Sequence, residues 1–86
     1  MKTKTKECKY LVPGSENIAP RNVKAARKLI GKVVEYLYNW DVTNDEMVAL
    51  RVGFVDDAYY DNIKIAGVWS RFTSVLEMKE AIHAEQ

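Results

Sequence analysis

The sequence predicts a single small α+β domain, in which two helices pack on one face of a small antiparallel sheet in the order β-α-β-β-α. Two patterns predict this class: one long stretch with apolar residues at helical spacing, and shorter stretches in which apolar residues alternate. A chain of 86 residues has room for one thin core, so we expect one domain over residues 1–86. Residues 1–7 are expected to form a flexible N-terminal arm.

The first half of the chain predicts a strand followed by a long helix. Residues 8–12 are typical of a short strand, which the turn sequence Pro13-Gly14-Ser15 would end. A helix is expected over residues 20–40, with Pro20 in its first turn. Its apolar stripe, at spacings of three and four, consists of Val23, Ala26, Ile30, Val33, Leu37 and Trp40. A stripe of this width can form a core and also leaves a homodimer seam open.

Residues 47–55 fit two interpretations. Apolar and other residues alternate there, as in a strand. Thr43 and Glu46 instead match a capping box, which would begin a helix. The β-branched residues and Gly53 favour the strand.

The C-terminal part predicts a further strand and a second helix. Residues 56–62 are expected to be a loop or hairpin connection, and residues 63–72 a strand with Ile63, Ile65 and Trp69 on one face. Ser74 and Glu77 form another capping-box pattern. It would begin a short helix whose inner stripe is Val75, Met78 and Ile82.

Charge is divided unevenly along the chain. Residues 1–32 carry nine Lys or Arg and two Glu, a net charge of +7, whereas residues 33–86 carry −6. On the expected helix the cations share the face opposite the apolar stripe: Arg21, Lys24, Arg27, Lys28 and Lys32. Such a face is typical of a protein that binds a polyanion or an acidic partner. The sequence therefore favours a small non-enzymatic binding module that engages an acidic macromolecule, either nucleic acid or protein.

A short motif suggests an alternative fold and function. Residues 49–60 resemble the helix-turn-helix core of AraC-type transcription activators, and the matching residues are Ala49, Val52, Gly53, Phe54, Asp56, Tyr59 and Tyr60. The resemblance implies an all-α protein with a helix-turn-helix over residues 43–65. It also implies a DNA-binding regulator whose second helix enters the major groove.

Acidic and aromatic residues suggest a second alternative. The expected 56–62 connection holds Asp56, Asp57, Tyr59, Tyr60 and Asp61, and Tyr38 lies on the polar side of the expected helix. Tyrosines are enriched at binding hot spots and also stack on bases. This set could bind a basic host protein by imitating nucleic-acid charge, as small accessory or inhibitor proteins of phages do.

Catalytic, metal and cofactor sites are not indicated by the sequence. Cys8 is the one cysteine and His83 the one histidine, so neither a disulfide framework nor a histidine metal pair is available. We expect no enzyme activity and no cofactor. The absence of disulfides favours the cytoplasm, and no apolar stretch approaches the length of a signal peptide core or a membrane span.

Overall fold

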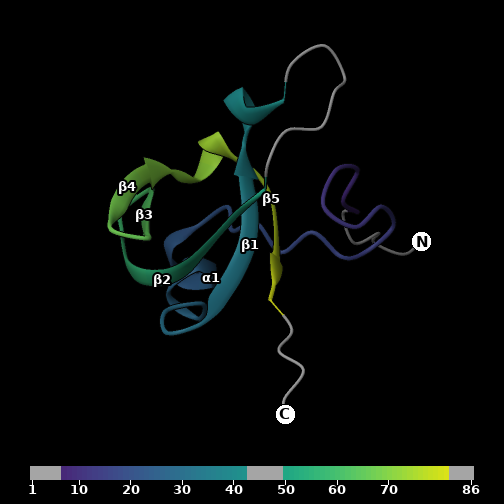
Figure 1. Cartoon of the computed structure of the whole chain (residues 1–86). Coiled ribbons are helices and arrows are strands. Elements are labelled where there is room, and N and C mark those ends of the chain that lie inside the picture. Colours follow the sequence, from purple (N-terminus) through teal and green to yellow (C-terminus); the bar gives the residue numbers. More distant parts are fainter. Residues whose placement is uncertain (1–6, 43–49, 82–86) are drawn as a thin grey trace, which may run out of the picture.

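The computed structural model describes residues 7–42 and 50–81. In these residues the chain forms one short helix, five strands and two single-turn 3₁₀ helices, η1 and η2 (Figure 1). The elements are α1 (Val23–Arg27), β1 (Val33–Tyr38), η1 (Asn39–Asp41), β2 (Arg51–Tyr59), β3 (Asn62–Ile65), β4 (Val68–Arg71), η2 (Phe72–Ser74) and β5 (Val75–Glu80).

The five strands form one antiparallel sheet in the order β4-β3-β2-β1-β5. The register shifts between Val55 and Asp57 in β2, and a bulge of this kind bends a strand. Figure 1 shows β2 as a strongly curved strand. The hydroxyls of Tyr38 on β1 and Ser70 on β4 lie 3.4 Å apart, although two strands separate β1 from β4 in the sheet. The sheet is therefore rolled toward a barrel.

The main core lies inside the rolled sheet. It consists of Ala26, Val34, Tyr36, Tyr38, Val55, Ala58, Ile63, Ile65, Phe72, Val75 and Met78. Ala26 is fully buried, and Val23 and Leu29 pack against the same cluster from α1 and the turn after it. The short helix thus covers one opening of the sheet, and its remaining side faces solvent.

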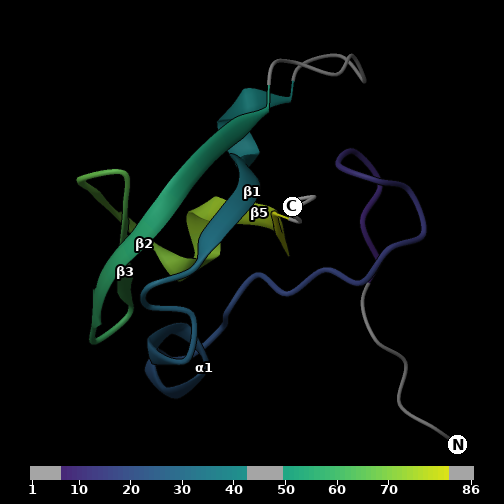
Figure 2. The same cartoon turned by 60° about the horizontal axis from the view of Figure 1, so that its bottom comes forward.

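A second, smaller cluster lies on the outer face of the sheet. The N-terminal segment, residues 7–19, crosses this face on the side of β1 and β5 away from α1 (Figures 1 and 2). Its Cys8 and Leu11 bury Leu37 of β1. The Glu77 carboxylate accepts hydrogen bonds from the backbone N–H groups of Lys9, Tyr10 and Leu11. A buried carboxylate therefore holds a segment that has no regular strand.

The predicted architecture of two helices on one face of a sheet is wrong, because the long helix over residues 20–40 does not form. The helix ends at Arg27, and Gly31 follows with a φ of 93°. Val33–Tyr38 is a strand that pairs with both β2 and β5. Val34, Tyr36 and Tyr38 alternate toward the core as in a strand, but the apolar residues of the same stretch also fit helical spacing. The homodimer seam that the apolar stripe of the long helix had left open loses its basis, because that helix is absent.

The predicted C-terminal helix is also wrong. Residues 72–74 form η2, and Val75–Glu80 is strand β5, paired with β1. Ile82, the last residue of the expected stripe, lies outside the described residues. The expected strand over residues 8–12 is likewise absent, although the turn at Pro13-Gly14-Ser15 is present, with the Ser15 N–H donating to the Val12 carbonyl.

The all-α alternative is wrong as well. Residues 51–59, the centre of the helix-turn-helix resemblance, form β2, whose backbone pairs with β1 on one side and β3 on the other. The expected strand over 47–55 overlaps β2, while residues 43–49 lie outside the described residues. The expected 56–62 connection is mostly strand, with its turn at Tyr60–Asp61.

Candidate functional site

Five cations surround α1 and form what we call the basic cluster: Arg21, Lys24, Arg27, Lys28 and Lys32. Asn22 caps the helix, since its side-chain oxygen accepts from the Ala25 N–H at 2.8 Å. Burial of Ala26 turns the opposite side of the helix outward, and all five cations are exposed. The cations thus lie on one short helix and its flanking turns, and not on one face of a long helix as expected.

The cations of the basic cluster differ in their partners. Lys32 Nζ lies 3.3 Å from a Glu80 carboxylate oxygen. Arg21 donates to the backbone carbonyls of Pro20 at 2.9 Å and Phe72 at 3.2 Å. Within residues 7–42 and 50–81, no carboxylate lies within ion-pair distance of Arg21, Lys24, Arg27 or Lys28. Four cations at one end of the molecule are therefore unneutralised by this part of the chain.

The β2–β3 hairpin presents two tyrosines beside the basic cluster. The rings of Tyr59 and Tyr60 stack with centroids 4.5 Å apart and an angle of 25°. They are 57% and 72% exposed. Phe72 joins the two features, because its N–H donates to the Asp61 carbonyl at 2.9 Å and its carbonyl accepts from Arg21.

The three aspartates of the hairpin have different surroundings. Asp56 lies at the bulge of β2 and accepts from the Gly67 N–H at 2.9 Å. Asp57 accepts from the Ala58 N–H and lies opposite Lys64 on β3. Asp61 is exposed in the turn. Two of the three carboxylates thus contribute to the hairpin structure.

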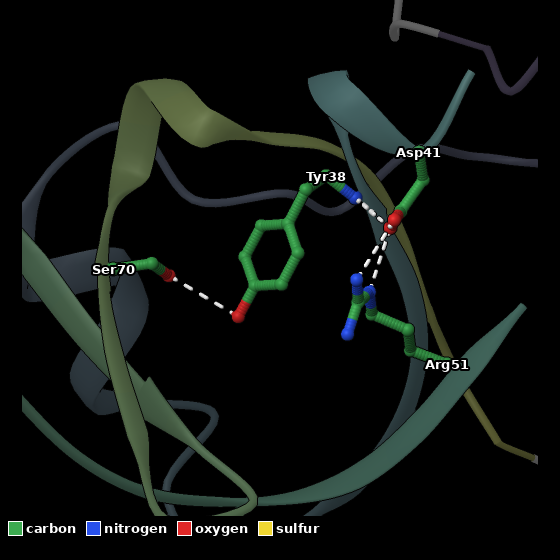
Figure 3. A network of polar contacts seen from close by, with 4 residues as sticks. All are labelled: Tyr38, Asp41, Arg51 and Ser70. Carbon is green, nitrogen blue, oxygen red and sulfur yellow. Dashed lines mark hydrogen bonds and ion pairs between the residues drawn. The ribbon is translucent and has the colours of Figure 1, made fainter. Parts of the chain in front are cut away.

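Tyr38, which we expected to be available for contact, is only 4% exposed. Its ring stacks on Trp40 at 4.5 Å, and the Arg51 guanidinium carbon lies 4.8 Å from its centroid. Asp41 forms two hydrogen bonds with Arg51, at 2.7 and 2.8 Å, and accepts the Tyr38 N–H (Figure 3). The Arg51 guanidinium lowers the pKa of the Asp41 carboxyl. Tyr38 is therefore a core residue at the end of β1.

Several exposed groups were missed by the sequence analysis. Trp40, part of the expected core stripe, is 58% exposed. Trp69 points outward beside Lys64, whose Nζ lies 5.9 Å from the indole, and not to the Ile65 side as expected. Val52 and Phe54 are exposed on the outer face of β2. The Ala66–Gly67 turn determines which face of the sheet Trp69 lies on. The Ala-Gly sequence was the only local indication of this turn.

Comparison with known proteins identified no relatives: no family model matches the chain, and neither a curated protein nor a solved structure is significantly similar to it. Among the described residues, no group of three or more His, Cys, Asp or Glu could hold a metal ion. No helix in residues 7–42 and 50–81 has the length and apolarity needed to cross a membrane.

Proposed function

We propose that this protein is a small non-enzymatic binding module whose basic cluster engages the phosphates of nucleic acid. The observation that supports the proposal is the gathering of exposed cations around α1, of which Lys24, Arg27 and Lys28 lack a carboxylate partner in the described residues. Cations of this kind release counterions when they meet phosphates, so binding is independent of sequence and weakens steeply with salt.

The neighbouring hairpin favours nucleic acid over an acidic protein surface. Tyr59 and Tyr60 are exposed and stacked. The adjoining Asp61 is connected to Arg21 of the basic cluster through the backbone of Phe72. Aromatic surface combined with cations is found where proteins hold nucleic acid without reading its sequence. An acidic protein would also engage the cations and could use the tyrosines as apolar contacts, but the flat faces of a stacked ring pair suit bases in particular. Binding of an acidic protein is therefore the alternative outcome of the test.

The use of the acidic hairpin toward a basic protein has weaker support. That function needs the carboxylates of Asp56, Asp57 and Asp61 as a common anionic surface. Asp56 and Asp57 instead accept backbone N–H groups, and Lys64 lies across the ladder from Asp57. Among the described residues, Asp61 is the one aspartate of the three whose carboxylate makes no such contact.

Fluorescence anisotropy with labelled oligonucleotides at about 50 and 200 mM salt tests the proposal. The variant Lys24→Glu/Lys28→Glu is expected to weaken binding at least tenfold and to reduce the salt dependence by about two phosphate contacts. Each substituted side chain is exposed, so the fold is expected to persist.

Lys9→Glu is the control, compared with Lys28→Glu alone. Each changes the net charge by the same amount, but Lys9 lies on the N-terminal segment, away from α1 (Figure 2). Lys9→Glu is expected to change affinity much less. Equal losses in the two variants, or no binding by the unaltered protein at the lower salt concentration, would contradict the proposal and point to a protein partner.

A further inference from the structure

We propose that Tyr59 and Tyr60 form a stacking platform for unpaired bases, so that the ligand of this protein is single-stranded nucleic acid. The inference rests on the proposed function, because the basic cluster would hold the phosphates of the same strand. It goes further by assigning a base-binding site and by distinguishing single strands from duplexes. Duplex bases already stack on one another and present no free face to a side chain.

The exposure of the rings supports this role. Tyr59 and Tyr60 stack on each other, and yet they are 57% and 72% exposed. Neither belongs to the two hydrophobic clusters of the described residues. The pair is thus a preformed flat aromatic surface in solvent, which is the arrangement that bases use for stacking.

The backbone at Tyr60 supplies an independent observation. Tyr60 has a φ of 57°, in the left-handed region that is costly for a bulky side chain. In two-residue hairpin turns such positions are usually Gly, Asn or Asp. A tyrosine here lowers stability while its ring adds nothing to the core. Strained positions of this kind concentrate at binding sites.

The distribution of charge separates the two parts of the ligand. Asp61 carries a carboxylate beside the platform, which disfavours a phosphate at that point. The Arg21 guanidinium donates to the Phe72 carbonyl, and the Phe72 N–H donates to the Asp61 carbonyl, so one cation of the basic cluster is connected to this turn through a single residue. A single strand would therefore place its bases on the tyrosines and its phosphates on the basic cluster.

The second hairpin of the sheet offers a matched control. Its turn, Ala66–Gly67, also has a non-glycine residue at positive φ, since Ala66 has a φ of 53°. Asn tolerates this conformation better than Tyr or Ala does. Tyr60→Asn and Ala66→Asn are therefore both expected to raise the melting temperature, by about 4 °C. Only Tyr60→Asn removes a ring of the platform.

Affinity and stability are measured together for these variants. The probe is a labelled oligothymidylate of about 12 nucleotides, compared with a duplex of the same length, in fluorescence anisotropy at about 50 mM salt. The unaltered protein is expected to bind the single strand about tenfold more tightly. Tyr60→Asn and Tyr59→Thr should each weaken single-strand binding about tenfold, whereas Tyr60→Phe and Ala66→Asn should not.

Two results would overturn the inference while leaving the proposed function intact: equal affinity for single strand and duplex, or unchanged affinity in Tyr60→Asn. Loss of affinity in Tyr60→Asn together with a lower melting temperature would also overturn it, because the tyrosine would then be structural. If neither nucleic acid binds, or if Lys24→Glu/Lys28→Glu has no effect, the proposed function fails and the platform fails with it.

Discussion

The inner and outer faces of β1 are covered in different ways. On the inner face, Val34 and Tyr36 belong to an apolar core that strands and α1 enclose. On the outer face, Leu37 is covered by the N-terminal segment, which forms no regular strand or helix. Within that segment the backbone N–H groups of residues 9–11 have no backbone partner in the described part of the chain, and the carboxylate of Glu77, a residue 3% exposed, accepts all three.

The difference shows how an irregular segment becomes part of a small protein. In helices and in paired strands the backbone N–H and C=O groups already have hydrogen-bond partners, so these elements can pack through apolar contacts alone. An irregular segment that is buried needs acceptors from elsewhere. Here one carboxylate supplies them at the cost of burying a charge. The stability of the outer face is therefore expected to depend on single polar side chains, and that of the inner face on the volume of its apolar side chains.

The largest effect is expected from Glu77→Gln, which replaces one acceptor oxygen with an NH₂ group facing N–H donors. We expect the free energy of unfolding to fall by about 3 kcal/mol, because buried backbone donors lose a charged partner. Cys8 reports on the segment locally. Burial, followed by smaller effects that include the Glu77 charge, raises the pKa of its thiol. Its reaction with a thiol reagent should therefore accelerate at least tenfold in the variant.

Glu80→Gln is the control for that experiment, since it makes the same chemical change on the same strand. Glu80 is exposed, and among the described residues its carboxylate pairs only with Lys32 Nζ, at 3.3 Å. Its substitution is expected to change stability by less than about 1 kcal/mol and to leave Cys8 protected. A Glu77→Gln protein with a protected Cys8 would mean that apolar contact alone holds the segment.

A smaller effect is expected from Asn17→Asp, where the same segment meets the edge of β5. The Asn17 side chain imitates a strand neighbour: its amide donates to the Leu76 carbonyl at 3.1 Å, and its oxygen accepts from Met78 N–H at 3.0 Å. Aspartate keeps the acceptor but places a carboxylate against a carbonyl. We expect a loss of about 1.5 kcal/mol in urea unfolding.

Asn22→Asp separates this effect from the general consequences of an Asn-to-Asp change. Among the described residues, the Asn22 side chain uses only its oxygen, which accepts from the Ala25 N–H, and Asn and Asp are equivalent at the start of a helix. Stability should be unchanged or slightly higher. If Asn17→Asp were equally harmless, the edge of β5 would not depend on the side-chain amide.

The smallest effect concerns the polar end of the inner face, where Asp41 meets Arg51. Hydrogen bonding to the guanidinium lowers the pKa of Asp41 below its ordinary value of 3.8. The folded state then favours the ionised carboxyl, so the pair stabilises the protein above pH 3.8. That contribution is lost as the pH falls through the lowered pKa. Arg51 is partly exposed, so we expect about 0.5 kcal/mol.

Comparison of the parent protein with Asp41→Asn in urea unfolding at pH 6 and near pH 2 checks this prediction. The stability difference should be present at pH 6 and should shrink toward pH 2, as the Asp41 carboxyl of the folded protein takes up a proton. A difference that persists at low pH would assign the role of Asp41 to packing instead of charge.

The sequence was most informative where the signal was local. The turn at Pro13-Gly14-Ser15 is confirmed. The single strand expected over residues 63–72 is instead the hairpin of β3 and β4, in which Ile63 and Ile65 share a buried face to which Trp69 does not belong. The grouping and exposure of the basic cluster were also predictable, because charged side chains seldom leave solvent. The Tyr59–Tyr60 pair was identified as a candidate contact, but its stacking and its strained turn were not, since both follow from the register of β2 with β3.

The secondary structure predicted from the sequence was wrong where a stretch fits both the helical and the strand periodicity. Residues 33–38 satisfy helical spacing when joined to Val23–Ile30, and they also alternate as a strand. Local pattern cannot choose between these, because the free energy of a strand comes from partners distant in the chain. Here those partners are residues 51–54 and 75–80, and β5 depends in turn on β1.

By itself, then, the sequence determined the turn at Pro13-Gly14-Ser15, the strand pattern that overlaps β2 and the concentration of cations in the first third of the chain. Only the tertiary structure decided that β1 and β5 are strands, that Tyr38 is buried and that Trp40 and Trp69 are exposed. The physical reason is that side-chain polarity and turn preference act over a few residues. Strand pairing, and the face that each residue then presents, depends on backbone hydrogen bonds between segments far apart in sequence.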